Sequence, residues 1–387
     1  MKFTSLFALF ASAQAQEWSN VYPNAADFLF GVATDATNAN VMHSTGGVNG
    51  VGGVVVYTLD GGQTFNGTKL PSALGLSMGI ASDGDDIFTV GFPSSAYSHD
   101  RGATFSETPP SPTTNPLLSQ AAASDSGAFY VTGMLLGGRN GVSRSTDGGE
   151  TFESFVIDKD SISTIARYGS FVGDTWYVTG GTWPADEDVN KDKSERMLTK
   201  RFTAEGHYKP QMKRGDGDDD GADSTFVAEI AKSTDGGKTW SNVFEDVGNF
   251  YFNGIDCLDS MTCVAVGESD ADSPDPGSRV WSTTDGGQTW VENFKTSDPQ
   301  ESLFTAKFVS KDEIWAVGGN VSNRQFLGRV WSSTDWAEKG EDSSWADVGG
   351  IDNAWLTDIG MAGEDGDAFA VALTIQSTAS VFKYTAA

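Results

Sequence analysis

Basic residues are scarce in this chain of 387 residues, where 25 Lys and Arg stand against 53 Asp and Glu and the net charge is −28. A negative field of that size disfavours nucleic acid and anionic membrane surfaces, so we expect neither as a partner. Long apolar runs are missing as well. No segment beyond the N-terminal leader approaches the length of a transmembrane helix, which argues against a membrane anchor.

Histidine and cysteine are also rare, with three and two copies. His43, His99 and His207 are scattered along the chain, so nothing supports a Ser-His-Asp triad. Cys257 and Cys263 flank an acidic turn, and we expect them to form a disulfide between adjacent antiparallel strands. A zinc site would be only half built, because the two thiols have no nearby His.

The N-terminus reads as a secretory signal. Met1 and Lys2 precede an apolar run from Phe3 to Ala11, and small residues follow it. The run is too short to span a bilayer as an anchor, so we interpret residues 1–15 as a cleaved signal peptide and residues 16–387 as the mature chain. We therefore expect the protein to be secreted or to lie in the lumen of the endomembrane system.

One phrase recurs along the chain: a hydroxyl residue, any residue, Asp, a further residue, Gly, a variable residue, Thr and an aromatic. It suits a tight hairpin, because the carboxylate accepts backbone N–H bonds, Gly takes a positive φ and the aromatic packs between sheets. The Asp residues of the good copies are Asp60, Asp100, Asp147, Asp235 and Asp285, and a degraded copy has Asp335 with Trp345 as its delayed aromatic. We interpret these carboxylates as structural, since each sits in its own turn and they cannot converge on one substrate.

The spacing of these Asp residues predicts the fold. Successive separations are 40 (100 − 60), 47 (147 − 100), 88 (235 − 147), 50 (285 − 235) and 50 (335 − 285) residues. A period of 40 to 50 residues built from short β-type segments indicates propeller blades. A second pattern, two apolar strands joined by an acidic turn, recurs at Gly31 to Ser44, Gly79 to Gly91, Ala121 to Gly133, Thr164 to Gly180, Gly254 to Gly267, Ala306 to Gly318 and Asp358 to Leu373.

These units number seven, and only one of them lies in the long gap, so that blade carries an insertion at about 184–225. The last unit ends with Ala379 to Tyr384 and has no fourth strand. A candidate stands at the N-terminus, where Trp18-Ser19-Asn20-Val21 repeats Trp240-Ser241-Asn242-Val243. We predict an all-β, seven-bladed propeller of four-stranded antiparallel blades, closed by pairing of the N- and C-terminal strands in one monomeric domain.

The recurring phrase resembles the Asp-box, or bacterial-neuraminidase, repeat of sialidases, sortilin-type receptors, some glucanases and a photosystem II assembly factor. The seven units look most like the assembly-factor type of propeller, a resemblance that implies a protein which holds assembly intermediates and is not an enzyme. Sialidases also need an arginine triad, a Tyr-Glu pair and an Arg-Ile-Pro type motif. Of the ten arginines here, Arg139, Arg279 and Arg324 fall in or beside the relevant loops, but no Tyr-Glu pair can be placed and the motif is absent, so we do not expect sialidase activity. Two features differ from the assembly factor, which presents a basic patch and whose plastid leader has no counterpart here.

Candidate ligand groups fall on the face that carries no Asp-boxes. The insertion contains Asp216, Asp218 and Asp220 at the first, third and fifth places of a calcium-type loop, but Val227 stands where the twelfth-place Glu belongs. We favour a solvated acidic tract, with calcium as the open alternative and no cofactor required. Other residues expected on this face are Glu268, Asp270, Arg139, Arg324 and Trp355.

Aromatic residues in the strand-entry segments, such as Phe28, Phe30 and Trp355, could line a sugar-binding surface, although core packing explains them equally well. Asn66 and Asn320 head glycosylation sequons. The sequence thus predicts a secreted, non-catalytic scaffold that presents its box-free face to a protein or glycan. A two-carboxylate glycoside hydrolase is the alternative, and a protein like the photosystem II assembly factor is the third interpretation.

Overall fold

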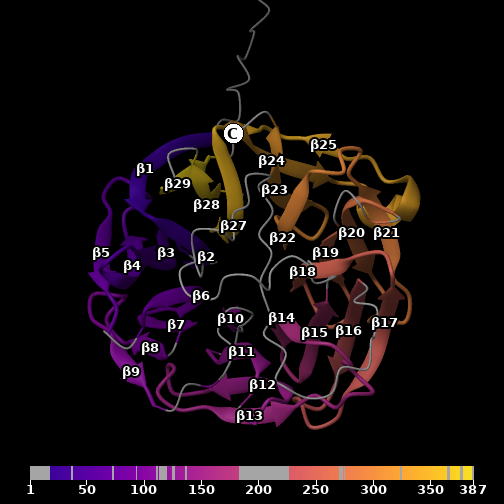
Figure 1. The fold of residues 1–387 in the computed structure, drawn as a ribbon, viewed down its shortest axis with the longest axis horizontal. Coiled ribbons are helices and arrows are strands. Elements are labelled where there is room, and N and C mark those ends of the chain that lie inside the picture. The colour runs from indigo at the N-terminus through magenta and orange to yellow at the C-terminus, as the bar shows by residue number, and fades with distance from the viewer. Residues whose placement is uncertain are drawn as a thin grey trace, which may run out of the picture.

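Seven antiparallel sheets stand around a central axis in the computed structural model of the chain, six with four strands and one with a short fifth strand (Figure 1). The structure describes residues 18–35, 38–71, 74–92, 94–109, 112, 120–123, 127–135, 137–182, 226–269, 273, 275–322, 325–363, 367–374 and 378–385. The predicted signal peptide and the whole of the predicted insertion lie outside these residues.

Each sheet is one propeller blade, and we number the blades along the chain. Blade 1 consists of β2 (Phe28–Asp35), β3 (Asn38–Val48), β4 (Gly52–Thr58) and β5 (Asn66–Lys69). Blade 2 consists of β6 (Leu76–Asp83), β7 (Asp86–Phe92), β8 (Ser95–Ser98) and β9 (Ser106–Thr108). Blade 3 consists of β10 (Gln120–Ala123), β11 (Phe129–Met134), β12 (Asn140–Ser145) and β13 (Glu153–Val156). Blade 4 consists of β14 (Ala166–Val172), β15 (Thr175–Thr182), β16 (Val227–Ser233) and β17 (Ser241–Val247).

The remaining blades complete the circle. Blade 5 consists of β18 (Tyr251–Cys257), β19 (Cys263–Ser269), β20 (Gly277–Thr283) and β21 (Val291–Lys295). Blade 6 consists of β22 (Ser302–Phe308), β23 (Ile314–Ser322), β24 (Gln325–Ser333) and β25 (Ala346–Asp347), with β26 (Ile351–Asp352) also paired to β24. Blade 7 consists of β27 (Ala354–Ala362), β28 (Asp367–Thr374), β29 (Ala379–Tyr384) and β1 (Trp18–Ala26).

The two ends of the chain meet in blade 7, as the repeat of the Trp18 segment predicts. β1 pairs antiparallel with β29, and Trp18 lies opposite Tyr384 in the register. Figure 1 shows the indigo β1 beside the yellow C-terminal strands at one position of the ring. The predicted closure is therefore confirmed, and it gives the inner three strands of blade 7 the fourth strand that they lack.

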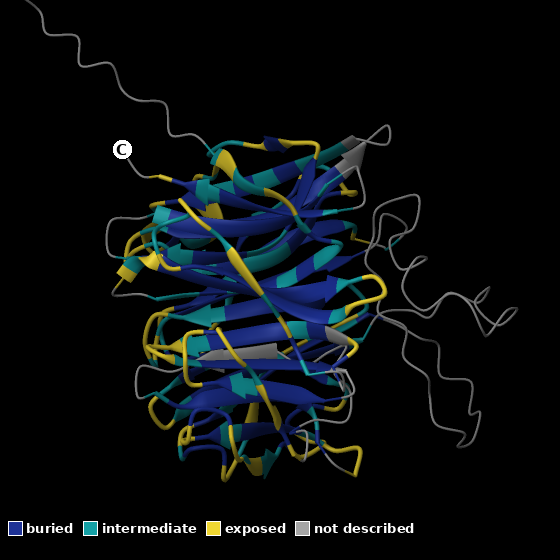
Figure 2. Cartoon of the chain, turned by 90° about the vertical axis from the view of Figure 1, so that its left-hand side faces the viewer, coloured by how far each residue is buried: buried dark blue, intermediate teal, exposed yellow. Residues whose placement is uncertain are grey.

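Apolar side chains fill the space between neighbouring blades. Buried residues form seven clusters, and each cluster joins two adjacent blades; one of them, for example, places Trp176 of blade 4 against Tyr130 of blade 3. Figure 2 shows the same arrangement from the side, with buried residues along the strands and exposed residues mainly at the turns. Burial of apolar surface at every interface supplies the main stabilisation of the ring.

The aromatic of each recurring phrase enters one of these clusters. The six that pack at the interface with the preceding blade are Phe65, Phe105, Phe152, Trp240, Trp290 and Trp345. Blade 7 has no box, and Trp18 packs at its interface with blade 6, 5.4 Å from the Tyr384 ring and 6.3 Å from the Trp315 ring. Trp18 therefore does for blade 7 what the box aromatics do for the other blades.

Replacing Trp18 with Ala should open the closing interface. Because the ring is partly buried and packs on two other aromatics, we expect the free energy of unfolding to fall by about 2 kcal/mol. Urea unfolding followed by fluorescence measures this, with the exposed Ser19→Ala as the matched control. Equal stability of the two variants would contradict the closing role of Trp18.

Candidate functional site

Side-chain hydrogen bonds shape the five good box turns in the same way. The hydroxyl that opens each turn accepts the N–H of the second Gly at 2.9 to 3.0 Å and donates to Oδ1 of the Asp at 2.7 to 2.9 Å. The same Oδ1 accepts the Thr backbone N–H at 2.8 to 2.9 Å, and Oδ2 accepts the Thr hydroxyl at 2.5 to 2.7 Å. Each carboxylate thus serves its own turn.

Electrostatics agree with this assignment. Hydrogen bonds from Thr64 and Thr239 hold the pKa values of Asp60 and Asp235 at about 2, far below the range of a proton donor. The Gly that precedes the variable residue has a φ between 82° and 97° in all five turns. Gly237 has a φ of 85°, and a Cβ there would lie 2.2 Å from the Trp176 ring.

In the degraded sixth turn the Asp carboxylate still accepts hydrogen bonds from the turn, although extra residues separate the Asp from the aromatic. Between Asp335 and the delayed aromatic stand α1 (Trp336–Lys339) and the 3₁₀ turn η3 (Gly340–Asp342). Oδ1 of Asp335 still accepts the backbone N–H of Ser344 at 2.7 Å, and Lys339 Nζ donates to Oδ2 at 2.7 Å. The side chain of Trp345 then packs between blades as the shorter turns place theirs.

Strand order assigns every turn to a face of the disc. In each blade the strands follow one another outward and run antiparallel, so the turn after the first strand and the box turn after the third share one face, which we call the box face. The turn after the second strand and the crossing to the next blade lie on the opposite, box-free face. β15 ends and β16 begins toward the box-free face, and the predicted insertion between them in the sequence lies outside the described residues.

The predicted ligand residues occupy different blades. Arg139 is exposed in the turn between β11 and β12, and Glu268 is 7% exposed at the end of β19, where it accepts the Tyr251 hydroxyl at 2.6 Å. Trp355, at the start of β27, is 2% exposed and packs between Phe304 and Phe326. The predicted Asp216, Asp218, Asp220 and Asp270 and the side chain of Arg324 lie outside the described residues.

The two sequons differ in accessibility. Asn66 is exposed at the start of β5, whereas Asn320 is 7% exposed and donates its amide to Asp298. A glycan on Asn320 would require that side chain to leave its buried position.

Cys257 and Cys263 form the disulfide that their spacing predicts, and they lie opposite each other on β18 and β19.

A feature that sequence reasoning missed lies on the innermost strands. Six of the seven carry a β-bulge at equivalent positions, where one residue falls out of register with the second strand. These bulge residues are Phe30, Met78, Arg167, Asn253, Phe304 and Thr357. Because the positions are equivalent and near the strand starts, the six residues surround the axis at one level toward the box-free face, and we call them the bulge ring.

The bulge ring has two chemically different sides. Phe30, Met78 and Phe304, from blades 1, 2 and 6, are partly exposed apolar side chains. Asn253 donates its amide to the Leu303 carbonyl at 3.1 Å. Arg167 is buried, with its guanidinium carbon 4.8 Å from the centre of the Tyr251 ring.

Charged groups line the innermost strands closer to the box face. Asp256 on β18 accepts the Phe308 backbone N–H at 3.1 Å, and Asp358 on β27 accepts the Val32 N–H at 2.8 Å, so each carboxylate binds the next blade. Lys307 Nζ lies 3.3 Å from Asp256 Oδ1. Burial raises the pKa of the Asp358 carboxyl to about 6 against the opposing pull of Lys307. Burial also lowers the pKa of Lys307, but the two carboxylates outweigh it and leave that pKa raised.

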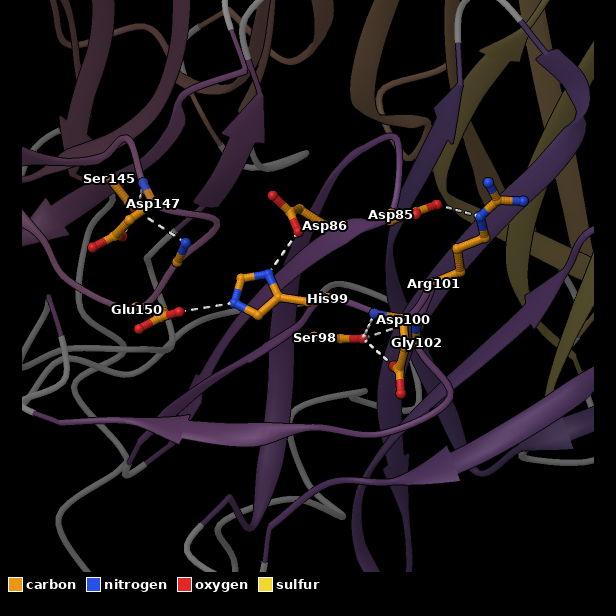
Figure 3. Close-up of polar contacts among 11 residues, drawn as sticks. Asp85, Asp86, Ser98, His99, Asp100, Arg101, Gly102, Ser145, Asp147 and Glu150 are labelled. Atoms are coloured by element: carbon orange, nitrogen blue, oxygen red, sulfur yellow. Dashed lines mark hydrogen bonds and ion pairs between the residues drawn. The ribbon is translucent and has the colours of Figure 1, made fainter.

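A histidine links two blades on the box face. His99, in the box of blade 2, places Nδ1 2.6 Å from Asp86 and Nε2 3.0 Å from Glu150 in the box of blade 3 (Figure 3). When the ring is protonated, both nitrogens donate a hydrogen bond to a carboxylate. These two contacts raise the pKa of His99, and the contact with Asp86 has the larger effect. Beside it, Arg101 Nε donates to Asp85 at 2.5 Å.

Within the described residues, no group of three or more His, Cys, Asp or Glu side chains is arranged to hold a metal ion. The predicted calcium loop lies outside those residues. No helix in the described part of the chain has both the length and the apolar character that a membrane span needs.

Comparison with solved structures identifies similar propellers. YCF48 from Cyanidioschyzon merolae has 13% identity and a TM-score of 0.60, with 95% of this chain and 98% of that chain covered. YCF48 bound to a D1 peptide has 12% identity and a TM-score of 0.58, covering 97% and 96%. The GH74 enzyme of Niastella koreensis has 16% identity and a TM-score of 0.56, but this chain spans only 51% of it while 91% of this chain is covered. No protein-family model and no curated protein matches the sequence. The likeness establishes the fold.

Asp358→Asn should change the pH dependence of stability. The folded pKa of about 6 lies above the unfolded value near 3.9, so this group's contribution is present below about pH 4 and lost as the pH rises through 6. We expect the Asn variant to lose about 2 kcal/mol less than the parent between these limits. Urea unfolding at a series of pH values measures it, and Asp312→Asn in an exposed turn is the control. Parallel curves for Asp358→Asn and the parent would refute the assignment.

His99→Gln should weaken the contact between blades 2 and 3 at a pH where the ring is protonated and leave it unchanged where the ring is neutral. The folded pKa is raised, so the protonated ring's contribution is present at pH 5.5 to 6 and lost as the pH rises through the folded pKa. Since the side chain is 45% exposed and solvent screens the contacts, we expect less than about 1 kcal/mol. Thermal unfolding tests it, with Thr234→Gln at the equivalent place of another box as the control. A loss of stability that persists unchanged at about pH 9 would contradict a contact that depends on the protonated His99 ring.

Proposed function

We propose that this protein is a non-catalytic binding scaffold that docks a protein segment over the bulge ring on its box-free face. The observation that carries the proposal is the set of six equivalent bulges, which brings side chains from six blades to one level around the axis. Bulges re-aim side chains that a regular ladder would hold in register. Four of the six, Phe30, Met78, Phe304 and Thr357, are partly exposed, and a surface drawn from four separate sheets suits recognition of one segment lying across the axis.

The chemistry of the ring indicates the kind of segment. Phe30, Met78 and Phe304 offer partly exposed apolar surface, and aromatic and thioether groups adapt to varied apolar partners. Asn253 in blade 5 and Thr357 in blade 7 are already bonded to carbonyls of the next blade, which fixes their positions. We expect a segment that turns apolar side chains toward blades 1, 2 and 6.

One pair of structural neighbours supports a protein ligand. YCF48, which matches this chain over nearly its full length, was solved bound to a D1 peptide. The compartment remains the one that the sequence predicts, secreted or luminal, and the disulfide fits an oxidising environment. An assembly-factor role like that of YCF48 is the narrower form of the same proposal.

A glycoside hydrolase is the second candidate, because GH74 enzymes share the fold. Such an enzyme needs two carboxyl groups about 5 to 10 Å apart across the scissile bond. Two described carboxylates at the box-free ends of their strands support the structure instead. Glu229 accepts four hydrogen bonds from Ser163 and Thr164, and Glu268 accepts one from Tyr251.

Binding to an immobilised peptide library should depend on the apolar side of the bulge ring. We expect Phe30→Ser with Phe304→Ser to weaken the strongest peptide at least about tenfold, because exposed aromatic anchors dominate such contacts. The control is Leu59→Ser, an exposed apolar residue on the box face, which should leave the affinity unchanged. Thermal unfolding confirms that each variant is folded.

The same protein should be screened on a glycan array with calcium and with a chelator, which also tests the predicted calcium loop. Release of reducing sugar by the pure protein would overturn the non-catalytic proposal. Peptide binding that survives both Phe substitutions would place the site elsewhere and refute the bulge ring.

A further inference from the structure

Two exposed apolar side chains stand close together on the box face. In the described part of the chain the large apolar residues with exposed side chains are Val51, Leu59, Val247, Leu258 and Met261. Leu258 and Met261 are 42% and 45% exposed, and both belong to the seven-residue turn from Cys257 to Cys263 in blade 5. The pair lies on the face opposite to the bulge ring.

This turn, which we call the disulfide loop, is held in place at many points. Leu258 N–H donates to the Thr262 carbonyl at 2.9 Å, and Asp259 Oδ1 accepts the N–H groups of Met261 and Thr262 at 2.7 and 2.8 Å. Contacts from outside add to these. The Tyr177 hydroxyl donates to the Ser260 carbonyl at 2.9 Å, and Gly286 N–H donates to the Met261 carbonyl at 2.8 Å.

The fixed backbone has an energetic consequence. A loop tied by a disulfide and by bonds from blades 4 and 5 loses little further conformational entropy when a partner binds. Nothing in these contacts requires an apolar residue at 258 or 261, since the bonds involve backbone groups and Asp259. Exposed Leu and Met on a preorganised loop are the arrangement expected of binding anchors.

The charges around the loop specify the partner. Asp259 and Asp285 both lie near Tyr177, where burial and then these two carboxylates raise the phenol pKa to about 12. The nearby Lys232 is already held by other contacts. Its Nζ donates to the Gly286 carbonyl at 2.6 Å and lies 5.2 Å from the Tyr177 ring centre. The apolar pair is therefore flanked by carboxylates in a chain of net charge −28.

We propose that the disulfide loop is a docking site for a basic segment of a partner protein, with an apolar side chain of that segment seated on Leu258 and Met261. A second copy of this chain fits poorly, because a symmetric contact would bring Asp259 and Asp285 against their own images. An anionic lipid surface is repelled for the same reason. Opposite charge on the partner favours encounter, and the apolar contact adds affinity.

Two labelled peptides test the proposal, one of alternating Lys and Leu and one of alternating Lys and Ser. Fluorescence anisotropy at about 150 mM salt, where the Debye length is near 8 Å, measures their binding to the full chain. We expect Leu258→Ser with Met261→Ser to weaken the Lys/Leu peptide about tenfold and to leave the weaker Lys/Ser peptide unchanged. Leu59→Ser is the matched control, since Leu59 is 40% exposed on the same face and adjoins Asp60. An equal loss in the control, or no loss in the double variant, would overturn the proposal.

A second measurement needs no variant of the loop. Oxidation of Met261 by dilute hydrogen peroxide, followed by mass spectrometry, reports the exposure of its sulfur. The Lys/Leu peptide should slow this oxidation severalfold and the Lys/Ser peptide should not. An unchanged oxidation rate would exclude docking on Met261. Equal protection by both peptides would show that binding needs only the positive charges of the peptide, and would overturn the proposed apolar contact. Neither result bears on the bulge ring, which lies on the other face.

Discussion

The whole ring depends on filling seven equivalent interfaces between neighbouring sheets. Each interface receives one aromatic side chain from the turn or terminus that precedes an outer strand, and Trp18 supplies the last of them. A blade alone would expose apolar residues on both of its faces, so no blade can be stable by itself. Pairing of β1 with β29 does more than add a strand, because it brings the aromatic that completes the interface between blades 6 and 7.

The box turns combine two tasks in eight residues. Their hydroxyl, Asp, Gly and Thr positions form the hydrogen bonds, and the aromatic packs between blades, which leaves the remaining positions free to vary. In blade 2 those free positions hold His99 and Arg101, and in blade 3 one of them holds Glu150. The contact between His99 and Glu150 in Figure 3 is therefore built from residues that do not take part in the hydrogen bonds of the turn. Arg101 even takes a φ of 59° where the other good boxes have Gly, while it binds Asp85.

Features encoded in a short stretch of sequence could be predicted. Features that depend on how two strands pair with each other, such as the β-bulges, could not. The repeated phrases located the third and fourth strands, Trp18-Ser19-Asn20-Val21 located the closing strand, and the spacing of Cys257 and Cys263 gave the disulfide. A bulge arises from the pairing of two strands, so Phe30 and Phe304 carried no distinctive sequence signal beyond Phe30 preceding a Gly. Trp355 looked like a ligand-face residue, yet it is buried beside Gly319, where even a Cβ would lie 2.5 Å from the indole ring.

The two proposed binding surfaces share one strand and should nevertheless act independently. β18 carries Asn253 of the bulge ring near one end and Cys257 of the disulfide loop at the other. Between them, Asp256 is tied to the Phe308 backbone of blade 6, and the Cys257 N–H is tied to Ser170 of blade 4 at 3.0 Å. A strand fixed to both neighbours and packed in a buried core transmits little motion unless it has a second arrangement to adopt. The architecture therefore suits a scaffold that holds one partner on each face of the disc without either ligand altering the affinity for the other.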